Sequence, residues 1–120
     1  MARTVITPIK LGTQNSFSTD VTSLCAAVDA SDGAAFTMDG HDERTLIIVQ
    51  NSATSAKKVT IKAGNGTQGA PDLEKSVTAS SFTVITLDSA RFKNVSGADK
   101  GKVIIKGESA DIKVACIMLP

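Results

Sequence analysis

The stretch "KKVTIKAGNGTQGAPDLEKS", residues 57–76, raises the question that decides the fold. An alternating apolar–polar run, typical of a strand, leads into Gly64-x-Gly66-x-x-Gly69, which has the spacing of a dinucleotide-binding fingerprint. Such a site needs a helix beginning at the glycines, because the helix N-terminus supplies the amides and the dipole that bind pyrophosphate. Pro71 could start a helix, but the apolar spacing after it fails within two turns and strand composition soon resumes. The stretch therefore predicts a glycine-rich turn that binds no nucleotide.

The rest of the chain repeats this style of short apolar runs separated by Gly, Asn, Asp and Ser. Such runs read as strands, and their spacing is typical of a sandwich or jelly roll. We therefore predict an all-β, single-domain, β-sandwich or jelly-roll-like fold. Residues 21–30 fit either a helix or a strand, with a strand slightly favoured, and 70–77 is the other place where a helix could form. The expected strands are 44–50, 58–63, 81–87, 102–107 and 111–118.

The two ends of the chain each leave two interpretations open. Residues 1–20 read as an extended N-terminal arm or edge strand, ahead of a sandwich domain at 21–120, because Pro8 belongs on an edge. The apolar residues of this segment would contact either a neighbouring subunit or their own sheet. The C-terminal strand ends in an apolar stretch that fits either a central strand or a subunit interface. The predicted interface residues of the arm are Val5, Ile6, Pro8, Ile9 and Leu11.

Composition argues against several classes of partner. The formal net charge is +1, from 13 basic and 12 acidic side chains, and the lysines are scattered, so we expect no nucleic acid partner. No apolar run approaches the roughly 18 residues of a membrane span, and the N-terminal residues lack the apolar stretch of a signal peptide, so we expect no membrane partner. Synthesis in a cytosol predicts that Cys25 and Cys116 are reduced, with Cys116 a small buried hydrophobe. With four Phe, no Trp and no Tyr, few aromatic side chains remain for stacking once the core is filled.

The candidate reactive residues do not form a recognisable site. "MDGHDER" at 38–44 gathers Asp39, His41, Asp42 and Glu43. His41 is the chain's single histidine, and the spacing of a calcium loop is missing, so the segment predicts a polar turn before a strand. No nucleophile motif accompanies it. We expect no catalytic residue, no cofactor, no metal and no enzymatic activity.

Three stretches carry a resemblance to a known family: "MARTVITPIKL", "RTLIIVQNSATSAKKVTIKAGNG", and "SSFTVITLDSARFKNVSGADKGKVIIKG" followed by "IKVACIMLP". Together they resemble the small β-rich capsid decoration (cement) proteins of tailed bacteriophages. The resemblance implies a virion structural protein, made in the host cytoplasm, that stabilises the outside of the mature capsid. Its implied partners are the major capsid protein lattice and copies of itself, as a homo-oligomer with a trimer favoured. The alternative is a β-sandwich binding module on a virion or tail that recognises a host surface glycan or protein.

Overall fold

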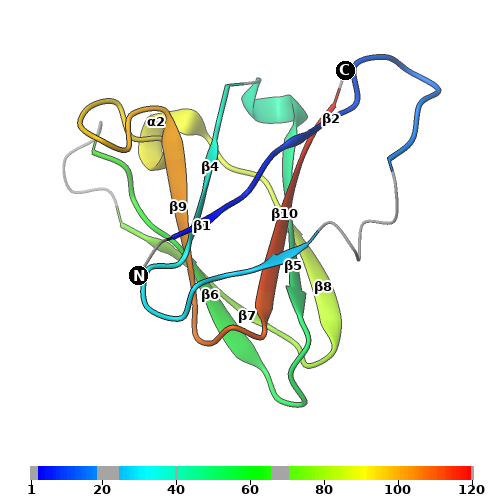
Figure 1. The fold of residues 1–120 in the computed structure, drawn as a ribbon, viewed down its shortest axis with the longest axis vertical. Coiled ribbons are helices and arrows are strands. Elements are labelled where there is room, and N and C mark those ends of the chain that lie inside the picture. Colours follow the sequence, from blue (N-terminus) through cyan, green and yellow to red (C-terminus); the bar gives the residue numbers. More distant parts are fainter. Residues whose placement is uncertain (1–2, 19–24, 40, 66–70, 120) are drawn as a thin grey trace.

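Eight strands, β3 to β10, pair as one long hairpin rolled into two sheets in the computed structural model, which describes residues 3–18, 25–39, 41–65 and 71–119 (Figure 1). The antiparallel pairs are β3 with β10, β4 with β9, β5 with β8, and β6 with β7. The sheet orders are β1-β4-β9-β6-β7 and β2-β10-β5-β8, with β3 also pairing with β10. This pairing is the jelly-roll topology, and it confirms the predicted all-β fold. The strands are β1 (Thr4–Val5), β2 (Ile9–Lys10), β3 (Ala26–Ala27), β4 (Ala34–Thr37), β5 (Thr45–Asn51), β6 (Lys57–Ile61), β7 (Leu73–Val77), β8 (Ser81–Ile85), β9 (Lys102–Gly107) and β10 (Ile112–Met118).

Inward-facing apolar residues of both sheets build the core between them. On β5, every second residue from Thr45 to Asn51 is buried, while the residues between them are half-buried on the outer face. On β10, Ile112, Val114 and Cys116 all lie in the core, which confirms the predicted burial of Cys116. β10 is flanked by β5 on one side and by β2 and β3 on the other, so it is a central strand. The core residues are Ile6, Val28, Ala34, Phe36, Met38, Ile47, Val49, Val59, Ile61, Val77, Leu87, Phe92, Val103, Ile105, Ile112, Val114, Cys116 and Met118.

The N-terminal segment crosses from one sheet to the other. β1 pairs in parallel with β4 in the first sheet, and β2 pairs in parallel with β10 in the second (Figure 1). Between them Ile6 is 5% exposed and packs in the core, and its amide donates to the Ala35 carbonyl at 2.8 Å. Of the predicted interface residues, Ile6 therefore serves its own domain. Val5 is exposed, and Pro8, Ile9 and Leu11 are partly exposed, so these four keep surface for a partner.

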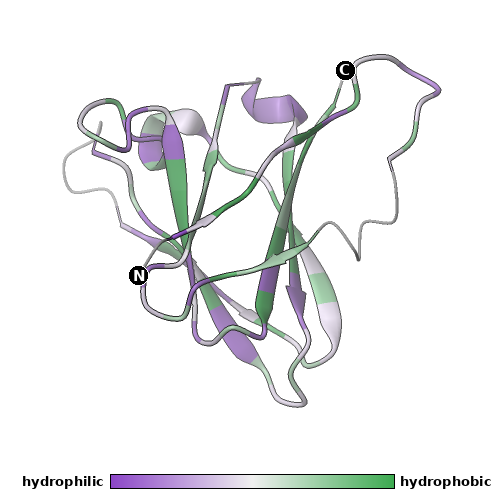
Figure 2. Ribbon diagram, viewed as in Figure 1, coloured by the Kyte–Doolittle hydropathy of each residue, from purple (hydrophilic) through white to green (hydrophobic). Residues whose placement is uncertain are grey.

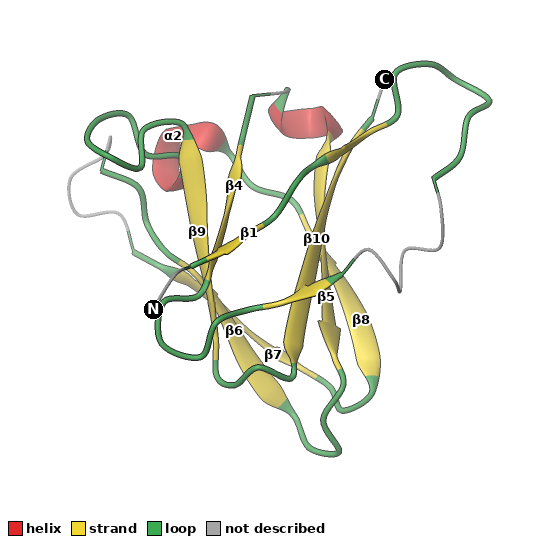
Figure 3. Cartoon of the chain, viewed as in Figure 1, coloured by secondary structure: helices red, strands yellow, loops and turns green. Residues whose placement is uncertain are grey.

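One local prediction needs correction. Residues 73–77, part of the segment 70–77 where a helix could form, are strand β7. The charges of "LEKS" do not oppose a strand at an edge, where four successive residues are exposed and only Val77 is buried. The described helices lie elsewhere, as η1 (Asp42–Arg44) and α2 (Ser89–Phe92), at the same end of the sandwich (Figure 3).

Other boundaries shift by a few residues. The strand expected at 81–87 ends at Ile85, and β4 was not predicted at all. Of residues 21–30, positions 25–30 are described and contain β3, which agrees with the favoured strand, whereas 21–24 lie outside the described residues. No helix in the described ranges has both the length and the apolar character needed to cross a bilayer.

Candidate functional site

The glycine-rich stretch is a hairpin loop. β6 and β7 are antiparallel neighbours, with Ile61 paired with Leu73, so residues 62–72 join adjacent strands and form no βαβ unit. The Gly64 amide donates to the Arg91 carbonyl at 2.7 Å, and a Cβ at Gly64 would lie 2.5 Å from the Lys93 carbonyl oxygen. Gly64 is therefore a close-packing residue against the chain around α2. Gly66 and Gly69 lie outside the described residues.

Side chains on both flanks of this loop hold it in place. Asn65 accepts a hydrogen bond from the Val95 amide at 2.8 Å and donates to the Ser96 carbonyl at 3.0 Å. Asp72 accepts from the Lys62 ammonium and from the Ala63 amide, both at 2.7 Å. The hydrogen bond from Lys62, and then that from Ala63, hold the pKa of Asp72 below its usual value. These groups stabilise a turn, as the sequence predicted.

The polar segment before β5 does not converge on a single point. Asp39 forms an ion pair with Lys10 at 3.1 Å, whereas the Asp42 carboxylate accepts from the Ser89 amide at 2.8 Å and from its hydroxyl at 3.1 Å. The His41 carbonyl accepts from the Thr45 hydroxyl at 2.8 Å. Across the described ranges, no three His, Cys, Asp or Glu side chains gather as metal ligands would. Residues 41–44 therefore form the predicted polar turn, with exposed Glu43 as part of it.

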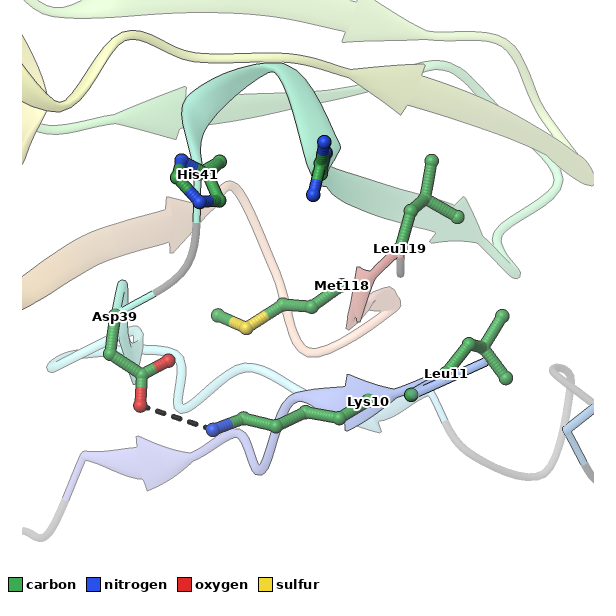
Figure 4. A pocket seen from close by; sticks show the side chains of 8 residues that line it. Lys10, Leu11, Asp39, His41, Met118 and Leu119 are labelled. Carbon is green, nitrogen blue, oxygen red and sulfur yellow. Dashed lines mark hydrogen bonds and ion pairs between the residues drawn. The ribbon is translucent and has the colours of Figure 1, made fainter. Parts of the chain in front are cut away.

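A pocket of about 230 Å³ opens where β2, the end of β10 and this polar turn meet (Figure 4). Met118 lies between His41 and Lys10 in the close-up, and Leu11 and Leu119 complete the apolar side. Backbone hydrogen bonds fix the walls, because the Leu11 amide donates to the Met118 carbonyl at 3.0 Å. The pocket is smaller than the roughly 300 Å³ at which small-molecule sites usually begin. The Lys10 charge is already engaged by Asp39, which leaves a shallow hollow of mixed polarity.

The cysteines are positioned as packing residues. Cys116 is fully buried, and burial first and the charge of Asp39 second raise the pKa of its thiol to about 12. Burial also raises the pKa of Cys25, and nearby Lys113 lowers it in part. A thiol is a weak nucleophile while it stays protonated. Both thiols are free and unsuited to nucleophilic work at neutral pH.

The buried polar side chains have structural roles. Asn51 donates from its amide nitrogen to the Ser55 and Val77 carbonyls, both at 3.0 Å, and its oxygen accepts from the Ala53 amide at 3.0 Å. It thereby holds the turn after β5 against the end of β7. Among the described residues, no buried side-chain nitrogen or oxygen lacks a hydrogen-bond partner. None of these buried atoms is therefore an unpaired group that could bind a ligand.

The surface displays several large apolar side chains, including two phenylalanines that the sequence analysis expected in the core. Phe17 is 93% exposed and Phe82 is 50% exposed, while Phe36 and Phe92 are buried. The expectation that the phenylalanines would fill the core is thus wrong for two of the four. Val5 and Val84, at 79% and 59% exposure, add to this surface. Phe17 could have been found from its setting, because "TQNSFSTD" offers no other apolar residue with which it could share a buried face.

Comparison with known proteins finds no matching family model, no similar curated protein and no similar solved structure.

Proposed function

We propose that the protein is a structural component of a tailed-phage virion and binds the outside of the capsid through its N-terminal segment, residues 3–18. One observation carries the proposal: this segment presents Val5 and Phe17 to solvent at 79% and 93% exposure. The loop that bears Phe17 extends away from both sheets (Figure 1). The Ser16 hydroxyl donates to the Thr13 carbonyl at 2.6 Å, which stabilises a turn within this loop.

The energetics of such docking suit a repeating shell. Burying an apolar side chain of this size contributes about 1.5–3 kcal/mol to binding, before the cost of ordering the chain is subtracted. One copy that buries only Val5 and Phe17 would therefore bind weakly. When several copies are linked and bind neighbouring positions of a capsid lattice, their weak contacts act together. The protein then stays bound to the capsid although each single contact is weak. The family resemblance of the sequence supports this role. The jelly roll supports it by analogy only, because this fold serves capsid and lectin domains alike.

The test is co-sedimentation of the purified full chain with mature shells of the phage that encodes it. We expect saturable binding, and at least tenfold weaker binding when Val5→Ser and Phe17→Ser are combined. Val95→Ser is the control, because Val95 is also an exposed apolar residue, at 53%, but lies outside the N-terminal segment. Absence of binding by the wild-type chain, or equal binding by the double variant, would refute the proposal.

Exposed aromatics also favour a second function, recognition of a host glycan or protein. Phe17 and Phe82 lie on the surface, and sugar-binding sites commonly use aromatic platforms. A glycan array with the full chain distinguishes this function from the first. Glycan binding that is lost on Phe17→Ser or Phe82→Ser, together with no affinity for shells, would favour it over capsid decoration.

A further inference from the structure

The two sheets each leave one longer strand with a free edge on the same side of the sandwich. β7 ends the first sheet and β8 ends the second, with no described strand paired to the outer edge of either. β7 carries Glu74 and Lys75, both exposed, and charges of this kind discourage pairing with another chain. β8 reads Ser81-Phe82-Thr83-Val84-Ile85, without a charge or a proline. Figure 2 agrees, because β8 lacks the strongly hydrophilic colouring seen on β6.

One row of residues across the outer face of the second sheet is apolar up to this free edge, and the next row runs from Phe82 to Gln50 and Lys113. β8 alternates, so that Ile85 packs against the core while Phe82 and Val84 face outward. In register, Val84 pairs with Ile48 on β5, and Ile48 pairs with Ala115 on β10. An unbroken apolar row therefore crosses three strands and stops at the edge of β8. An edge of this composition is a template for a further strand.

We propose that β8 pairs antiparallel with β8 of a second copy of this chain, about a two-fold axis through Thr83. In that register Phe82 lies opposite Val84 of the partner subunit, and the reverse contact follows from the symmetry. An aromatic residue opposite a β-branched residue is a favourable cross-strand pair. The contact is self-complementary, as a two-fold interface requires.

The absence of charge on β8 is what selects a second copy as the occupant. Two identical charged strands would oppose like charges near the axis, whereas β8 brings none to it. A partner recognised by charge would find no counter-charge along this strand. The outward Phe82 and Val84 of the two copies would meet as one apolar cluster, flanked on each side by Ile48. This pairing does not depend on the proposed binding to capsids.

The first experiment is sedimentation equilibrium on the purified full chain. We expect a dimer of twice the 12.4 kDa chain mass, and Val84→Lys should raise the dissociation constant at least tenfold. Val95→Lys is the matched control, because Val95 has nearly the same exposure in a loop away from β8, and it should leave the dimer intact. A wild-type monomer would overturn the proposal. So would a trimer, because an isologous two-fold contact cannot close a three-fold ring.

A second measurement uses the unmodified chain and so remains decisive if Val84→Lys does not fold. Hydrogen exchange of residues 81–85 is followed over a roughly hundredfold range of protein concentration. Pairing should slow the exchange of alternate β8 amides as concentration rises, while amides of β7, the charged edge, should not change. Exchange in β8 that is independent of concentration would overturn the proposal.

Discussion

Replacing Ile6 by alanine tests whether the N-terminal segment is part of the folded domain. Ile6 is 5% exposed, packs in the core, and lies between the strands that join the segment to each sheet. The substitution removes three carbon atoms, worth about 0.8 kcal/mol each in transfer free energy, and leaves a cavity that adds to the loss. Because the segment lies at the edge of the sandwich and can partly collapse, we expect the free energy of unfolding to fall by about 2.5–3.5 kcal/mol.

The assay is urea unfolding followed by circular dichroism, with Val5→Ala as the matched control. Val5 is adjacent in sequence but 79% exposed, so its loss should change stability by less than about 0.5 kcal/mol. We expect a single cooperative transition in both variants, because residues 3–11 belong to both sheets. A loss below about 0.5 kcal/mol for Ile6→Ala would refute the reasoning, since it would mean that the segment is not docked on its own domain in solution.

Two further outcomes follow from the packing. Gly64→Ala should lower the free energy of unfolding by about 1–3 kcal/mol, because the new Cβ would meet the Lys93 carbonyl oxygen at 2.5 Å. Gly12→Ala is the control in the same urea titration. It should leave the free energy of unfolding unchanged, because no atom lies within 4 Å of the new Cβ. Cys116 should resist alkylation by iodoacetamide at neutral pH until the chain unfolds, because burial raises the pKa of its thiol to about 12. Mass spectrometry should find that Cys25, which is partly exposed, is labelled first. Equal labelling rates for the two folded-state thiols would contradict the burial of Cys116.

The sequence predicts strands whose apolar composition is strong. On β5 and β10 each buried position is apolar or a hydrogen-bonded polar residue, so both segments can be recognised as strands without any knowledge of their partners. The hairpin at the glycines was also predictable, because the competing fold demands a helix that the following residues cannot form. Both signals depend only on residues that are close together in the chain, so they can be recognised from a single sequence.

What escaped prediction depends on pairing and packing that the local residue pattern does not show. β7 has one buried residue in five, and only its pairing with β6 makes it a strand. β4 is buried at Ala34, Ala35 and Phe36 in succession, so it shows no alternation. For Ile6, the sequence could not distinguish burial in the core of its own domain from burial against a partner subunit, because both environments favour the same apolar residue. The exposure of Phe82 likewise depends on β8 lying at the edge of its sheet.

The strand orders place β1 and β2, which belong to the N-terminal segment, at the opposite ends of the sheets from β7 and β8. The N-terminal strands begin both sheets, and β7 and β8 end them. A dimer formed through β8 would therefore leave the β1 edge, with Val5 at 79% exposure, free on each of its two far sides. Such a dimer could engage two neighbouring positions of a capsid lattice, and the second contact would benefit from a high effective concentration.

The two proposals can then fail separately. Val5→Ser with Phe17→Ser should weaken shell binding at least tenfold and leave the dimer mass unchanged. Val84→Lys should give a monomer that still binds shells, but with occupancy lower than that of the wild type at equal chain concentration, because each contact now acts alone. If this monomer decorated shells as fully as the wild type, pairing through β8 would serve a purpose other than attachment. If neither variant changed shell occupancy while both altered the dimer, the N-terminal segment would belong to the self-association surface, and docking would have to be sought on another face of the sandwich.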